Sequence, residues 1–162
     1  MAPAVDVSGH DQLRTEATLL RSRVLAIRRV VRHLPGLSDA GVVDAITRIR
    51  PLINHLAAHG RAEEHIIYPY AERFGGTGLT LLRDDHTRLE ELASAITAWT
   101  LAPTMDRAKL ALSLTVFCDL AEAHLDREAD RCLEVIHAHS SARTERYLHG
   151  EVEIETFETE GQ

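Results

Sequence analysis

The chain has 162 residues, a length that encloses the hydrophobic core of one domain without disulfides or a structural metal. Its formal net charge of −7 at pH 7 argues against a nucleic-acid-binding surface, because phosphate contacts need a local excess of Lys and Arg. The only cysteines, Cys118 and Cys132, indicate neither a disulfide framework nor a cysteine-rich zinc site. No apolar run approaches the roughly 18 residues of a membrane span, and residues 1–11 lack the pattern of a signal peptide. We therefore expect a soluble, cytoplasmic protein that binds neither nucleic acid nor membranes.

The first predicted helix covers residues 13–34, where apolar residues recur in alternating steps of four and three. Ser8 resembles the start of a capping box, and the Pro-Gly pair at 35–36 ends the helix. The basic cluster at 28–32 is interpreted as the solvated face of this helix. The inward face is predicted to contain Leu13, Ala17, Leu20, Val24, Ile27, Val31 and Leu34.

The second predicted helix begins near Ser38 and ends at Ile67, before Pro69 and the Gly-Gly pair at 75–76. Pro51 lies inside this segment and predicts a kink or a break. The inward positions are predicted to be Val43, Ile46, Ile49, either Leu52 or Ile53, Leu56, His59, Glu63 and Ile67.

Two more helices are predicted, over residues 78–100 and 105–136, with a turn at Pro103 between them. The inward stripe of the third helix contains Leu82, His86, Leu89, Ala93 and Ile96. The stripe of the fourth contains Leu110, Leu114, Phe117, Ala121, His124 and Glu128. Four amphipathic segments joined by short turns, with no competing strand pattern, predict an all-α fold, an antiparallel up-and-down four-helix bundle with a short C-terminal extension.

The expected domain organisation is one helical bundle over residues 1–149, followed by an acidic tail over residues 150–162. A short additional helix is expected to reach about Leu148. The tail has no helical period, so we expect it to be disordered or loosely docked.

Histidine and glutamate occupy inward positions that a purely hydrophobic bundle would fill with apolar residues. These residues are His59 and Glu63 in the second helix, His86 in the third, and His124 and Glu128 in the fourth. A His followed four residues later by a Glu places both side chains on one helical face, where both can reach one metal ion. Burial of an ionised carboxylate needs a cation or strong hydrogen bonds, so we interpret the set as a metal site, with a hydrogen-bonded polar core as the alternative.

The mixture of imidazole and carboxylate donors suits iron, and manganese less well, whereas zinc usually takes fewer ligands. Carboxylates such as Glu63 and Glu128 can bridge two metals, so a dinuclear site is one interpretation and a single ion is the other. The His-x-x-x-Glu spacing is weak evidence by itself, because His86 with Glu90 and His149 with Glu153 are expected as chance matches.

Three segments resemble the hemerythrin family, also called HHE cation-binding domains: HLAAHGRAEEHIIYP, DDHTRLEEL and AHLDREADRCLEVI. The resemblance covers about residues 13 to 136, and the family is among the known helical bundles. It implies a di-iron site in which His59, His86 and His124 are terminal ligands and Glu63 and Glu128 are bridges.

The chain departs from the family pattern in the first helix, which normally contributes another His. Ala17 stands where that His is expected, so one metal of a pair would bind more weakly or keep an open position. Glu16 or His55 could replace the missing ligand, and His55 is the better candidate because it shares a face with His59 and Glu63. The alternative is that His55 is an ordinary, partly buried residue at the kink near Pro51.

These residues lead to three functional hypotheses. The first is a non-heme iron protein that binds or reacts with dioxygen, peroxide or nitric oxide at an open metal position. The second is a metal-dependent oxidative enzyme that admits a small organic substrate to an apolar pocket near Ala17, Leu20 and Val24. The third is a metal-free, degenerate bundle that acts as an interaction module.

Overall fold

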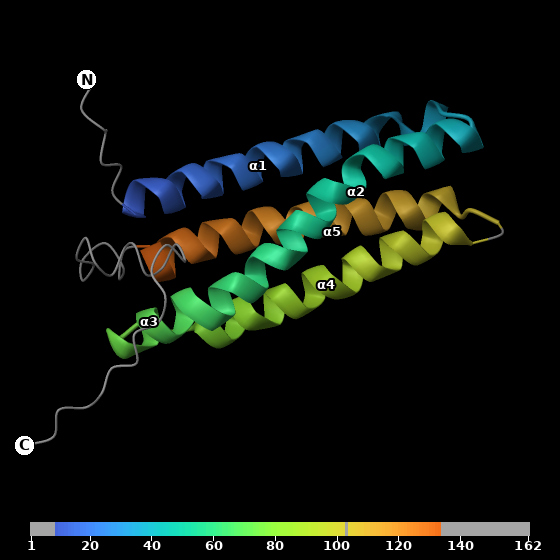
Figure 1. The fold of residues 1–162 in the computed structure, drawn as a ribbon. Coiled ribbons are helices and arrows are strands. Elements are labelled where there is room, and N and C mark those ends of the chain that lie inside the picture. Colours follow the sequence, from blue (N-terminus) through green and yellow to red (C-terminus); the bar gives the residue numbers. More distant parts are fainter. Residues whose placement is uncertain (1–8, 103, 134–162) are drawn as a thin grey trace, which may run out of the picture.

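The computed structural model describes residues 9–102 and 104–133, and over these residues it confirms an all-α bundle (Figure 1). The four long helices are α1 (Gly9–His33), α2 (Asp39–Ala62), α4 (Leu79–Leu101) and α5 (Arg107–Glu128). Helix α1 packs against α2 and α5, and α4 packs against the same two helices. Each helix therefore lies beside the next one in the chain, and α5 closes the bundle against α1, as the up-and-down arrangement requires.

The helix ends follow local sequence signals. Proline in the first turn of the 3₁₀ segment η1 (Leu34–Gly36) directs the chain out of α1. The hydroxyl of Ser38 accepts a hydrogen bond of 3.1 Å from the backbone N–H of Gly41, and so caps α2. The carboxylate of Asp106 caps α5 in the same way, accepting a 3.0 Å hydrogen bond from the N–H of Lys109.

The inward face of α2 differs from the predicted face at its start. Val42 is buried, whereas Val43 is 46% exposed, so the prediction of Val43 as a core residue was wrong. Val42 lies four residues before Ile46, and this spacing keeps the buried positions on one continuous helical face. Of the two alternatives further along, Ile53 is the buried residue and Leu52 is half-buried.

The second helical segment continues further than the sequence predicts. Helix α2 is not broken at Pro51, although its ribbon bends near the middle in Figure 1. The chain then forms a π-helical segment, η2 (Glu63–Ile67), and a further α-helical turn, α3 (Tyr68–Arg73). The expectation of an end at Ile67 was wrong, because Pro69 lies in the first turn of α3, where a missing N–H is tolerated.

Both carboxylates predicted as metal ligands lie at π-helical segments. Glu63 begins η2, and its carbonyl accepts the N–H of Tyr68, five residues later. Glu128 ends α5 and is followed directly by η3 (Ala129–Leu133). Single widened turns of this kind occur frequently at functional sites, because they change which side chains share a face.

The described core consists of two apolar clusters with buried polar side chains between them on η2, α4 and α5. The larger cluster contains residues such as Ile53, Leu89 and Ala121, and the smaller one contains residues such as Tyr68 and Leu82. We call the five buried polar residues between these clusters the polar layer: Glu63, Asp85, His86, His124 and Glu128. Burial of so many ionisable groups in one place requires compensation by partners or by a cation.

An ion-pair network holds α1 against α5. The guanidinium of Arg28 donates hydrogen bonds of 2.7 Å to Asp119 and of 2.7 and 3.0 Å to Glu122. The interpretation of the basic cluster as a merely solvated face was therefore incomplete, because Arg28 joins two helices.

Several sequence predictions concern residues outside the described part of the chain. They are the capping box at Ser8, the turn at Pro103, the end of the fourth helix near residue 136, the short helix towards Leu148 and the acidic tail at 150–162. Among the described residues, no helix combines the length and the apolar character needed to cross a bilayer.

Candidate metal centre

The side chains of the polar layer converge from three helical segments. Two groups of side chains hold donor atoms that all lie within 4.8 Å of one another. The first group is Glu63, His86 and His124, and the second is His59, Glu63 and Glu128. Glu63 belongs to both groups, so the two candidate metal positions are adjacent. The structure thus brings together five of the six residues predicted as ligands.

The first group has the spacing of donors around a single ion. The Nε2 atoms of His86 and His124 are 3.0 Å apart, and Glu63 Oε2 lies 3.1 Å from the first and 3.7 Å from the second. Nitrogen and oxygen donors that bind one metal at about 2.1 Å lie roughly 3 Å from each other. The three donor atoms therefore face a common point.

The second group is richer in carboxylate. His59 Nε2 contacts Glu63 Oε1, and Glu128 completes the group from the end of α5. The His59 side chain is 12% exposed, whereas Glu63 and Glu128 are buried. This position thus has one imidazole and two carboxylates, and it lies closer to the surface.

The two buried carboxylates have opposite pKa shifts. Burial raises the pKa of Glu63, but its close contacts with Glu128 and with the surrounding imidazoles outweigh burial and hold the pKa well below its usual value. Burial and the adjacent charge of Glu63 raise the pKa of Glu128 well above its usual value. Burial lowers the pKa of His59, but its hydrogen bonds with Glu16 and Glu63 raise the net value to about 10. These directions favour an ionised Glu63 beside a protonated Glu128 in the absence of a cation.

One buried oxygen lacks a hydrogen bond in spite of close nitrogen neighbours. Glu63 Oε2 accepts no hydrogen bond of acceptable geometry, although His86 Nε2 lies 3.1 Å away. A buried carboxylate oxygen without a donor is costly, and a cation at the common point of the first group would satisfy it. The donor set fits a metal.

The sequence profile of the hemerythrin HHE cation binding domain matches residues 8–136 of the chain. The chain belongs to the hemerythrin family. Searches of curated proteins and of solved structures gave no significant match. The family match includes every residue of the two donor groups of this hemerythrin domain. A family defined by cation binding is therefore consistent with the convergence of these donor atoms.

Helix α1 of this hemerythrin domain brings a carboxylate to the site. Ala17 is half-buried, and its neighbour Glu16 places Oε1 3.2 Å from His59 Nδ1. His55, the substitute favoured by sequence reasoning, is exposed and belongs to neither donor group. Between the two proposed substitutes, the contacts bring Glu16 to the site and leave His55 outside it.

Two groups at the site escaped the sequence analysis. Asp85 is buried and accepts hydrogen bonds of 2.5 and 3.1 Å from Arg127 of α5. The hydroxyl of Tyr68 lies 3.2 Å from His86 Nε2. Asp85 has a sequence signal, since it lies three residues after the core residue Leu82. Tyr68 has none, because only the π-helical turn brings it to His86.

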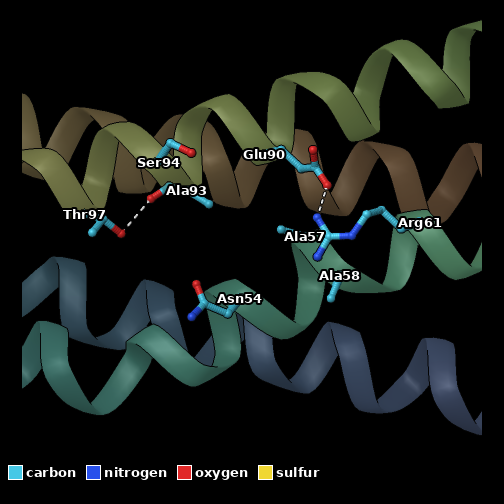
Figure 2. A pocket seen from close by; sticks show the side chains of 8 residues that line it. All are labelled: Asn54, Ala57, Ala58, Arg61, Glu90, Ala93, Ser94 and Thr97. Atoms are coloured by element: carbon cyan, nitrogen blue, oxygen red, sulfur yellow. Dashed lines mark hydrogen bonds and ion pairs between the residues drawn. The ribbon is translucent and has the colours of Figure 1, made fainter.

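A shallow groove of about 430 Å³ runs between α2 and α4 (Figure 2). Its lining includes Ala57, Ala93 and the ion pair of Arg61 with Glu90, which joins the two helices at one end of the groove. Leu20 and Val24, which were expected to line an apolar pocket beside Ala17, are completely buried in the core. The groove lies between α2 and α4 and none of these residues lines it.

Proposed function

We propose that this hemerythrin domain binds two iron ions and that it binds or reacts with dioxygen, peroxide or nitric oxide. The observation that carries the proposal is the pair of donor groups that share Glu63. Two overlapping groups around one buried carboxylate support two neighbouring ions better than they support one.

The two positions are proposed to differ in strength. The first ion takes His86, His124 and Glu63, and a set of two imidazoles and one carboxylate is the one that ferrous sites with open positions use. The second ion takes His59, Glu63 and Glu128. With one imidazole in its described donor group, the second ion is expected to bind more weakly and to keep an open position.

Bound iron would supply electrons and open coordination positions for a small ligand. The chain contributes the surroundings of that position. The apolar clusters on both sides of the polar layer exclude water. Burial, followed by the charges of Glu63 and Glu128, raises the pKa of Tyr68, so its hydroxyl keeps its proton and can donate a hydrogen bond at the site.

Anaerobic reconstitution tests this proposal. The metal-free protein is titrated with ferrous iron, and bound iron is measured by elemental analysis after gel filtration. We expect two ions per chain in two phases, and an optical spectrum that changes when oxygen, peroxide or nitric oxide is added. Binding of manganese with the same stoichiometry and tighter affinity would contradict the choice of iron.

Variants assign the two phases to residues. Glu63→Ala should abolish both phases, whereas His86→Ala should abolish the tight phase, with helix content by circular dichroism nearly unchanged in each case. Less than a small fraction of one ion per wild-type chain would instead favour the metal-free interaction module. Conversion of a small organic substrate by the iron-loaded protein would favour the oxidative enzyme.

A further inference from the structure

All three histidines of the candidate centre point the same ring nitrogen inward. His59 Nε2 contacts Glu63 Oε1, and the Nε2 atoms of His86 and His124 lie 3.1 and 3.7 Å from Glu63 Oε2. These three rings come from α2, α4 and α5. The shared orientation means that each Nδ1 atom points away from the metal positions.

Each outward Nδ1 atom has its own carboxylate. Glu16 Oε1 lies 3.2 Å from His59 Nδ1, and Glu64 Oε1 lies 2.7 Å from His86 Nδ1. The third carboxylate, Asp85, places Oδ2 3.6 Å from His124 Nδ1. The three carboxylates come from α1, η2 and α4, so no single repeated motif produces the pattern.

Asp85 is the most enclosed of the three carboxylates. It is only 2% exposed, and its Oδ2 atom also accepts both hydrogen bonds from Arg127. His124 Nδ1 is buried and has no hydrogen-bond partner, and Asp85 Oδ2, 3.6 Å away, is a nearby acceptor. The guanidinium therefore holds Asp85 beside the one ring nitrogen that still needs an acceptor.

We propose that Glu16, Glu64 and Asp85 are positioning residues that each accept the Nδ1–H of one metal-binding histidine. A carboxylate at Nδ1 fixes the neutral tautomer whose lone pair lies on Nε2, orients the ring and makes Nε2 a stronger donor. In this arrangement Glu16 does not replace the missing histidine of α1 as a ligand. Glu16 acts through His59, because its carboxylate accepts a hydrogen bond from Nδ1, the ring nitrogen that faces away from the metal.

The inference rests on the proposed metal site, and it is tested with Glu16→Gln, Glu64→Gln and Asp85→Asn. Cobalt(II) affinity of each variant is measured by competition with a chelator. We expect the cobalt(II) affinity of each variant to fall about 10- to 100-fold, with two ions still bound at saturation. Losses of this size are typical when a carboxylate that hydrogen-bonds a metal-binding histidine is removed. Glu90→Gln is the matched control, because Glu90 pairs with Arg61 on the surface one turn from His86.

A second measurement separates positioning from general structural damage. Nitrogen-15 NMR of the zinc-loaded protein should show three protected Nδ1–H signals, and each variant should lose or shift the signal of its own histidine only. Glu16→Gln keeps the test valid if Asp85→Asn fails to fold, because the Glu16 side chain is 38% exposed.

Two results would overturn the inference: metal bound through Nδ1 of the histidines, or variant affinities equal to that of Glu90→Gln. Failure of the wild-type protein to bind cobalt(II) would contradict both the proposed function and this inference. Tight wild-type binding with unaffected variants would remove only the positioning roles.

Discussion

The imidazole of His86 lies directly against the backbone of α2 at Gly60. A Cβ atom on Gly60 would come within 2.5 Å of Cγ and Cδ2 of the ring, and within 2.9 Å of Nδ1. Real Cβ atoms do not approach other atoms this closely, so only glycine permits the ring to occupy this place. Two adjacent residues of α2 therefore contribute to the site. His59 provides a donor atom, and Gly60 leaves space for the ring of His86.

The variant Gly60→Ala is expected to displace His86 and to weaken the tight metal phase by at least tenfold. Alanine favours the helix by about 1 kcal/mol over glycine, so helix content should not fall. Iron or cobalt(II) titration with circular dichroism checks both expectations. Ala58→Gly is a suitable control, because Ala58 is an exposed residue of the same helix. Wild-type affinity in Gly60→Ala would show that His86 is not required where the structure places it.

The stability of the metal-free protein is expected to fall as the pH rises from about 6.5 to 10. The pKa of His59 is about 10 against an ordinary value of 6.5, so the folded protein holds a proton that the unfolded chain has lost. Its contribution is complete below 6.5 and disappears as the pH passes 10. The raised pKa of Glu128 acts in the same direction above its ordinary value of 4.5.

Thermal unfolding in the presence of a chelator, measured from pH 6 to pH 10, tests this dependence. His59→Gln should flatten the profile, because it removes the group that titrates. The metal-loaded protein should depend on pH less steeply in this range, since cations take the place of the protons. A melting temperature that rises between pH 7 and pH 9 in the metal-free protein would contradict the prediction.

His55 and His59 provide a matched pair of variants. His55→Ala is expected to leave metal stoichiometry and affinity unchanged, because His55 is exposed and lies outside both donor groups. His59→Ala should lose the weaker phase and keep the tighter one. Elemental analysis and titration of both variants check the pair. Equal losses in the two variants would return His55 to the list of ligands.

The far end of the bundle is expected to support folding independently of the metal site. Leu110 is completely buried and lies fourteen residues before His124 on α5, about 21 Å away along the helix axis. Leu110→Ala should lower the free energy of unfolding by about 2–5 kcal/mol, measured by denaturant unfolding, without loss of bound metal. Leu112→Ala, at a residue that is 64% exposed, should change it by less than about 0.5 kcal/mol. Loss of metal in Leu110→Ala would show that the two ends are coupled.

Helical periodicity was sufficient to find the inward histidines and glutamates, because they share the faces of the apolar residues around them. It misplaced His55 for a geometric reason. Steps of four residues advance about 40° beyond a full turn, so His55 is rotated by about 80° from Glu63. That rotation carries the side chain out of the polar layer, although each single step is compatible with a shared face.

Tyr68 and Asp85 could not be assigned from periodicity for two different reasons. In a regular α-helix, Tyr68 would be rotated by about 140° from Glu63, and only the π-helical hydrogen bond brings it to His86. Asp85 lies on the inward face, but a carboxylate next to another acid, Asp84, is interpreted as solvent-exposed unless its half-buried partner Arg127 is known.

A widened turn is equivalent to one extra residue in an otherwise regular helix. In the described part of the chain, one widened turn begins at Glu63 and another directly follows Glu128. Everything beyond each insertion is shifted in helical phase relative to the residues before it. The smaller apolar cluster, with Tyr68 and Cys132, is built entirely from side chains that lie past Glu63 or Glu128, or at the start of α4. Removal of a single residue between Glu64 and Ile67 would thus leave the proposed ligands in place. It would rotate the η2 and α3 side chains of the smaller apolar cluster, Tyr68 among them, away from these ligands.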